Sequence, residues 1–203
     1  MASRQSIVHQ ALLYLGQDLV ADPQAQGITA QLVASVFDDT LAEALALHPW
    51  SFAMRAVTLA RRAAPPTDSR FAHAFALPAD MARIVQVEWL DGGGDGEFAA
   101  ANSLPVAAYS VQGDALLCNA GQVQLVYVPT AVPAARMPPA FCHLLALMLA
   151  CRLAYKIVGD HQLLRTLLQR LPAVRQEAVH IDGEQAHTLP ENRPNLFVAI
   201  RAY

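Results

Sequence analysis

Residues 138–159 read PPAFCHLLALMLACRLAYKIVG. Two prolines suit the first turn of a helix, where the missing N–H donor would have no helical partner anyway, and Gly159 suits its end. The apolar residues between them cover most of the helix circumference and do not form a single stripe. We therefore expect a helix over Ala140–Val158 that is either the central helix of the core or is covered by another subunit.

Two more helices are expected before this segment. Ser6 can cap the first, whose apolar residues recur at helical spacing until Gly16 helps to end it. Thr29 can cap the second, which Pro49 closes. Its apolar stripe consists of Val33, Val36, Phe37, Leu41, Ala44, Leu45 and His48. Asp38, Asp39 and Glu43 fall on the opposite face of that helix.

A fourth helix is expected after Gly159. Asp160 can cap it, and the stripe that follows is made of leucines. Pro172 should kink or break the chain before Val174–Val179. From Gly183 the sequence becomes a polar tail, which ends in an apolar, β-prone segment, Asn195–Tyr203.

Between Trp50 and Tyr127 the pattern changes to short runs rich in β-branched and aromatic residues, separated by Pro and Gly. Gly92–Gly94 and Gly113-Asp114 are expected to be connections, and one face of the sheet is expected to pack on the helices. The expected strands are Arg55–Ala60, Phe71–Leu77, Arg83–Leu90, Ala115–Cys118 and Gln122–Val128.

This order predicts an α+β fold, in which a four-helix antiparallel bundle has a β-rich antiparallel domain inserted between its second and third helices. Residues 1–50 and 137–182 would form the bundle, residues 51–136 the insert, and residues 183–203 a C-terminal tail. An inserted domain commonly has its two ends close together, as this arrangement requires.

Composition favours an ordinary folded domain. The chain has 203 residues, 54% of them hydrophobic, and a net charge of −3, which gives no bulk electrostatic reason to expect nucleic-acid binding. The longest uninterrupted apolar run, Leu144–Cys151, is far shorter than a bilayer span, so we expect no membrane association. No secretory leader is recognisable, which favours the cytoplasm. The three cysteines lack the spacing of a zinc site or a disulfide framework.

The sequence offers few groups for catalysis. Asp38, Asp39 and Glu43 are the nearest to a carboxylate cluster, and a solvated helix face is the expected role. His180–Glu184 could present metal ligands, although capping or surface roles are expected. No GxSxG elbow, P-loop or GxGxxG segment is present. We therefore expect neither an enzyme nor a bound cofactor or metal.

Four segments, in the same order, resemble the tail tubular protein A family, the head-to-tail connector (adaptor) proteins of short-tailed bacteriophages. They are HPWSFAMR (48–55), FALPADMARI (75–84), VQGDALL (111–117) followed by Val123–Tyr127, and PPAF (138–141) with the helix after it. The resemblance covers roughly residues 5–160. The positions that carry its signature are Pro49, Trp50, Phe52, Ala53, Leu77, Pro78, Asp80, Arg83, Pro139 and Phe141.

The resemblance implies a structural protein that forms a dodecameric ring under the portal protein and a platform for other tail proteins, with DNA passing through its channel without sequence-specific binding. It would lie in the neck or tail of the virion and assemble in the host cytoplasm. The apolar terminal segment would suit docking on the portal by strand addition. Its apolar residues are Leu196, Phe197, Val198, Ile200 and Tyr203.

Two other functions remain open on the sequence. One is a glycan-cleaving phage tail component, similar to a peptidoglycan hydrolase, that uses Asp38, Asp39 or Glu43. The other is a stand-alone helical interaction module. Trp50 and Phe52 are expected to be core residues that join the bundle to the insert, because large aromatic side chains dominate such contacts.

Overall fold

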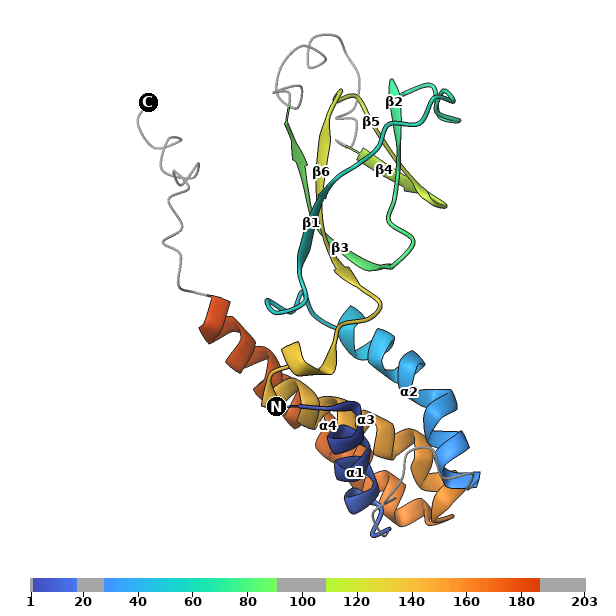
Figure 1. Ribbon diagram of the computed structural model, residues 1–203, viewed down its shortest axis with the longest axis vertical. Coiled ribbons are helices and arrows are strands. Elements are labelled where there is room, and N and C mark those ends of the chain that lie inside the picture. Colours follow the sequence, from blue (N-terminus) through green and yellow to red (C-terminus); the bar gives the residue numbers. More distant parts are fainter. Residues whose placement is uncertain (1, 18–27, 91–108, 187–203) are drawn as a thin grey trace.

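A computed structural model of the chain describes residues 2–17, 28–90 and 109–186. Within these ranges the fold is α+β, with four α-helices and two antiparallel sheets, which confirms the predicted class. The helices gather at one end of an elongated molecule and the sheets at the other (Figure 1). The helices are α1 (Arg4–Tyr14), α2 (Ile28–Ala46), α3 (Pro139–Ile157) and α4 (His161–Ala186), with a short 3-10 helix, η1 (Ala134–Arg136), before α3.

Helix α3 is the centre of the helical layer. It packs against α1, α2 and α4, and its residues are buried almost without interruption from Phe141 to Ala154. Of the two alternatives for this helix, the first therefore holds, because its apolar surface is covered largely within its own chain. Only its C-terminal end carries large exposed apolar groups, Tyr155 and Val158.

By length and composition α3 would also be able to cross a membrane. That test is equally passed by core helices, and 61% of the apolar window in α3 is buried inside the molecule. Its place at the centre of the helical layer accounts for its composition.

The helix ends differ from the prediction in two places. Ser3, and not Ser6, caps α1, and the two serines form a reciprocal capping box in which each side chain accepts a hydrogen bond from the other's N–H. Thr29 lies inside the first turn of α2, because that helix already begins at Ile28. The Asp160 cap is confirmed, since its Oδ1 accepts hydrogen bonds from the N–H groups of Gln162 (2.7 Å) and Leu163 (3.3 Å).

Helix α4 is longer than predicted. Pro172 lies inside it, and the helix does not break there. It also runs through Gly183 to Ala186, so the first four residues assigned to the polar tail are helical. The side chains of Leu167, Val174 and Ala178 are buried on both sides of the proline, and this packing holds the helix together despite one missing hydrogen bond.

In the part of the chain that the structure describes, six strands form two three-stranded antiparallel sheets, with strand orders β1-β6-β3 and β2-β5-β4. Strand β4 was not among the expected strands, whereas β5 matches its expected bounds. Gly113, with φ +60°, and Asp114 form the tight turn between β4 and β5. The strands are β1 (Arg55–Thr58), β2 (His73–Ala76), β3 (Met81–Trp89), β4 (Tyr109–Gln112), β5 (Ala115–Cys118) and β6 (Val123–Pro129). Gly92–Gly94 lie outside the described residues.

The sheets enclose a core of their own, and the expectation that one sheet face packs on the helices is wrong. Phe75, Leu116, Val123 and Leu125 are buried together in this core. The chain after β1 also pairs with β2, because Ala76 N–H donates to Ala60 O (3.0 Å) and thereby joins the two sheets. The helices meet mainly one end of the sheets, near the end of β6 and the start of β3 (Figure 1). That contact is the junction described next.

Candidate functional site

Three aromatic rings form the centre of the junction between helices and sheets. Trp50 lies 5.0 Å from Phe141 between ring centroids, and Phe52 also lies 5.0 Å from Phe141; both pairs pack edge to face. Trp50 is buried, and its indole Nε1–H donates to the Ala44 carbonyl of α2 at 2.9 Å. The segment after α2 is thus fixed to the first turn of α3, as the sequence predicts for Trp50 and Phe52.

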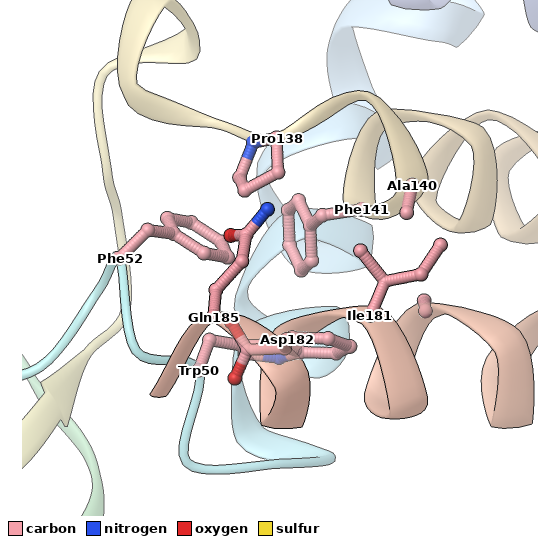
Figure 2. Close-up of a pocket in the computed structure, with 9 residues that line it drawn as sticks. Trp50, Phe52, Pro138, Ala140, Phe141, Ile181, Asp182 and Gln185 are labelled. Atoms are coloured by element: carbon pink, nitrogen blue, oxygen red, sulfur yellow. The ribbon is translucent and has the colours of Figure 1, made fainter. Parts of the chain in front are cut away.

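A buried carboxylate closes the same junction from α4. Asp182 is only 5% exposed, and it accepts hydrogen bonds from Ser51 N–H (3.0 Å) and from Ser51 Oγ (2.7 Å). His48 Nε2 lies 3.5 Å from Asp182 Oδ2, so the pair becomes ionic when the imidazole is protonated. Figure 2 shows Asp182 next to Trp50, below the rings of Phe52 and Phe141.

Sequence reasoning missed Asp182, although a signal was present. Val174, Ala178 and Asp182 follow one another at intervals of four residues, so the carboxylate lies on the buried stripe of α4. A charged group at such a position needs hydrogen-bonding partners. Without the fold, however, nothing in the sequence identifies Ser51 as that partner.

His48, Ser51 and Asp182 are the residue types of a hydrolase triad, but their arrangement differs from one. In a triad the imidazole lies between the hydroxyl and the carboxylate, so that it can take the proton of the hydroxyl. Here the Ser51 hydroxyl donates directly to the carboxylate. This geometry anchors the loop after α2 and does not activate a nucleophile.

A small pocket lies between the aromatic rings and α4 (Figure 2). Trp50, Phe52, Phe141, Ile181 and Asp182 are among the residues that line it. Its volume of about 10 Å³ is room for about one water molecule. The junction is therefore a packed contact, and this pocket does not offer space for a substrate.

A second group of contacts lies at the end of the sheets that is nearest to the helices. Asp80, before β3, accepts hydrogen bonds from Arg55 of β1 (3.0 Å) and from the Tyr127 hydroxyl of β6 (3.1 Å). Burial, and then the hydrogen bond to Asp80, raise the pKa of the Tyr127 hydroxyl above its usual 10.0. The Arg55–Asp80–Tyr127 group thus ties together segments that are far apart in the sequence.

Two arginines hold the boundary between sheets and helices. Arg83 of β3 points its guanidinium at the carbonyls of Ala46 and Leu47, at the end of α2, with N–O distances of 3.4 Å. These carbonyls have no acceptor role inside the helix and carry partial negative charge, which a cation stabilises. Arg136 donates to the Phe52 carbonyl (3.3 Å), so the chain segments that leave and re-enter the helical layer lie side by side.

The remaining predicted positions have other surroundings. Ala53 is buried in the helical core, Pro49 lies half-buried beside Trp50, and Pro139 is the first residue of α3. Leu77 packs against the sheet core, and the Pro78 carbonyl accepts the N–H of Met81 (3.1 Å). The segment with Leu196, Phe197, Val198, Ile200 and Tyr203 lies outside the described residues.

The carboxylates considered for glycan cleavage lie on an exposed face of α2. Asp38 forms an ion pair with Arg4 (3.2 Å), and Glu43 forms one with Arg152. Asp39 is exposed, and no ion pair within the described ranges includes it. All three carboxylates come from one helix, whereas glycosidic acid–base pairs face each other across a bound sugar.

Other candidate chemistry is equally limited in the part of the chain that the structure describes. His180 and Glu184 form an exposed i,i+4 pair (3.3 Å) within α4, while Asp182 lies on the buried face. No group of three or more metal-ligating side chains occurs among these residues. Burial raises the thiol pKa of Cys142 and of Cys151, which disfavours the reactive thiolate.

Comparisons with known proteins add no relative: no family model matches the chain, and no match is found among curated proteins.

Proposed function

We propose that this chain is a head-to-tail connector adaptor of a short-tailed bacteriophage or prophage, as its resemblance to the tail tubular protein A family implies. It would form a dodecameric ring under the portal protein, with DNA passing through the channel and other tail proteins bound below. Its place would be the neck or tail of the virion, after assembly in the host cytoplasm. In this proposal its role is structural and not catalytic.

One observation carries the proposal: residues from all four segments that carry the resemblance contact one another. Arg55, Asp80 and Tyr127 come from the first three segments and share two hydrogen bonds. Trp50 of the first segment packs on Phe141 of the fourth. Segments that resemble a family by chance have no reason to lie together in the fold. The segments of a true family signature are expected to lie together when they maintain one structural joint.

The proposed architecture is a four-helix antiparallel bundle, residues 1–50 and 137–182, that carries a β-rich insert, residues 51–136. The order of elements, with two helices before the strands and two after them, supports this division. The hydrogen bond between Arg136 and Phe52 supports it too, because the ends of an inserted domain lie close together. In this proposal the segment after α4 serves as the docking tail for the portal.

Charge is compatible with a DNA channel. A lining that DNA slides through should not hold phosphates tightly, since each lysine or arginine contact to a phosphate adds salt-dependent affinity. The net charge of the chain is −3, which favours weak contact with DNA.

The decisive experiment is co-expression of the full chain with the portal protein of the same phage genome, followed by size-exclusion chromatography and electron microscopy. We expect a high-mass complex with a ring of the chain on the portal. A chain that shows native circular dichroism but elutes apart from an assembled portal would refute the proposal. A variant that ends at residue 194 should fold normally and lose most of the co-elution, because it lacks the apolar segment.

A further inference from the structure

The turn between α3 and α4 carries an exposed cluster that the junction does not use. We call it the α3–α4 corner: Tyr155, Lys156, Val158, His161, Arg165 and Leu168, all of them exposed. The ring of Tyr155 lies 5.3 Å from that of His161. His161, Arg165 and Leu168 share one face of α4, because they follow at intervals of four and three residues.

The α3–α4 corner combines apolar surface with positive charge. Tyr155, Leu168 and Val158 are 55%, 48% and 37% exposed, which are high values for large apolar side chains. Lys156 and Arg165 take part in no ion pair within the described ranges. The Asp160 carboxylate, which caps α4, adds one negative charge nearby, so the two cations leave the corner with a net positive charge.

A second surface of the same chain has complementary properties. We call it the acidic α2 face: Ser35, Asp39, Ala42, Glu43 and Ala46, which recur at helical spacing on the side of α2 away from the core. Its small side chains leave room for bulky ones to approach. Asp39 has no ion-pair partner among the described residues, whereas Glu43 forms an ion pair with Arg152 of α3.

We propose that the α3–α4 corner of one copy docks on the acidic α2 face of the next copy. Tyr155 and Leu168 would pack over Ala42 and Ala46, while Lys156 and Arg165 would face Asp39. Apolar burial supplies the free energy, and the charges mainly set the orientation, because exposed ion pairs contribute little. This inference rests on the proposed function, since it names the contact between copies in the ring.

Because the two surfaces differ, the contact is head-to-tail, and repetition of such a contact closes into a ring when the rotation permits. The same interface in isologous form would place identical patches against each other. That arrangement would bring two positive corners together, and the repulsion between them disfavours it.

Cross-linking tests the contact directly. The single variants Ala46→Cys and Leu168→Cys are mixed in equal amounts and treated with a short bismaleimide, both alone at high concentration and with the portal present. Wild type gives the background from its three cysteines. We expect about five-fold more cross-linked dimer in the mixture than in either variant alone, in at least one of the two conditions. Equal yields in both conditions would overturn the inference.

Charge reversal gives an independent test. Asp39→Arg alone and Arg165→Glu alone should each reduce assembly, while an equal mixture of the two should regain it, because copies can then alternate around an even-numbered ring. Glu177→Arg, a reversal at an exposed residue of α4 outside the corner, is the matched control and should assemble like wild type. Single variants that assemble normally would contradict the interface.

The two proposals fail separately. Portal co-elution of wild type decides the proposed function, whereas the yield of the mixed cross-link decides the interface. A chain that binds the portal without the cross-link keeps the function and loses this interface. A chain that cross-links without binding the portal keeps the interface and loses the function.

Discussion

At the scale of single residues, Asp182 shows how a buried charge can fix a joint. Its Oδ2 accepts the backbone N–H of Ser51 and also lies near His48 Nε2, while its Oδ1 accepts the Ser51 hydroxyl. Burying an ionised group is costly unless hydrogen bonds compensate, and here they do. The last turns of α4 are thereby tied to the loop that leads into β1.

Replacement of Asp182 tests this anchor. Asp182→Ala should lower the free energy of unfolding by about 1–3 kcal/mol, because the Ser51 donors lose their partner in a buried place. Asp182→Asn keeps one acceptor oxygen and should cost less. Urea denaturation followed by circular dichroism measures both. Glu177→Ala, at an exposed position of the same helix, should stay within about 0.5 kcal/mol of wild type; an equal effect of both alanine variants would contradict the anchor.

Tyr127 makes a prediction for alkaline pH. Its pKa is higher in the folded chain than in the unfolded one, so the unfolded chain loses this proton first as pH rises. The stability that Tyr127 contributes is therefore complete below about pH 10 and is lost as pH rises toward the folded pKa.

The matching variant is Tyr127→Phe, compared with Tyr109→Phe at an exposed tyrosine. Denaturation midpoints are measured between pH 8 and 11. Wild type should lose more stability over this range than Tyr127→Phe, while Tyr109→Phe should follow wild type. A Tyr127→Phe chain with the same pH dependence as wild type would show that the hydroxyl is not held in its neutral form.

At the scale of elements, the sequence predicts well wherever one local pattern dominates. The apolar segment after Pro138 forms the expected helix, and β5 has its expected bounds, because both are buried and uninterrupted. Strand β4 was missed because it is only four residues long and mostly exposed; it exists because a tight turn pairs it with β5. The break predicted at Pro172 is wrong, because the tertiary packing of α4 outweighs the local cost of a proline within a helix.

The candidate site was predictable only in part. Aromatic residues beside a change of pattern identify Trp50 and Phe52 as joining residues, and both lie at the junction. The positions of Asp182 and Arg83 beside them depend on hydrogen bonds to Ser51 and Ala46, more than thirty residues away in the sequence, which periodicity does not encode. The separate sheet core also escaped prediction, because alternation shows that a face is buried but not what covers it.

Two glycines give opposite predictions for the same substitution. Gly16 ends α1 with φ +65°, and N–H groups of residues 16 and 17 reach the carbonyls of Leu13 and Leu12. Gly16→Ala should therefore cost about 1 kcal/mol, since an L residue is strained there. Gly183 lies inside α4 without positive φ, and open space surrounds a Cβ there, so Gly183→Ala should stabilise the chain by about 0.5–1 kcal/mol. Thermal denaturation compares the two; a shift of the melting temperature in the same direction would contradict the assignment.

At the scale of the whole molecule, the two larger hydrophobic cores of the described residues meet at one joint. The helical core and the sheet core are distinct clusters. Arg83 of β3 bonds the end of α2, while the aromatic rings, Asp182 and Arg136 fix the two segments that link helices and sheets. We expect this joint to make the two parts unfold together.

A variant in one core should therefore be felt in the other. In a Trp89→Phe background Trp50 is the remaining tryptophan and reports on the junction. Leu125→Ala, deep in the sheet core, should lower stability by about 2–5 kcal/mol and shift the urea transition of Trp50 fluorescence and of circular dichroism equally. Val111→Ala, at an exposed position of β4, should leave both within about 0.5 kcal/mol. Two separated transitions would show that the joint does not couple the cores.

The hydrogen bond from Arg136 to the Phe52 carbonyl has an evolutionary consequence. The chain leaves the helices near Phe52 and returns to them near Arg136, and these two points are adjacent. The residues between them can therefore be lengthened, shortened or exchanged without moving the helix ends. Recombination could thus replace the sheets to fit a new binding partner while the helices keep their existing partner.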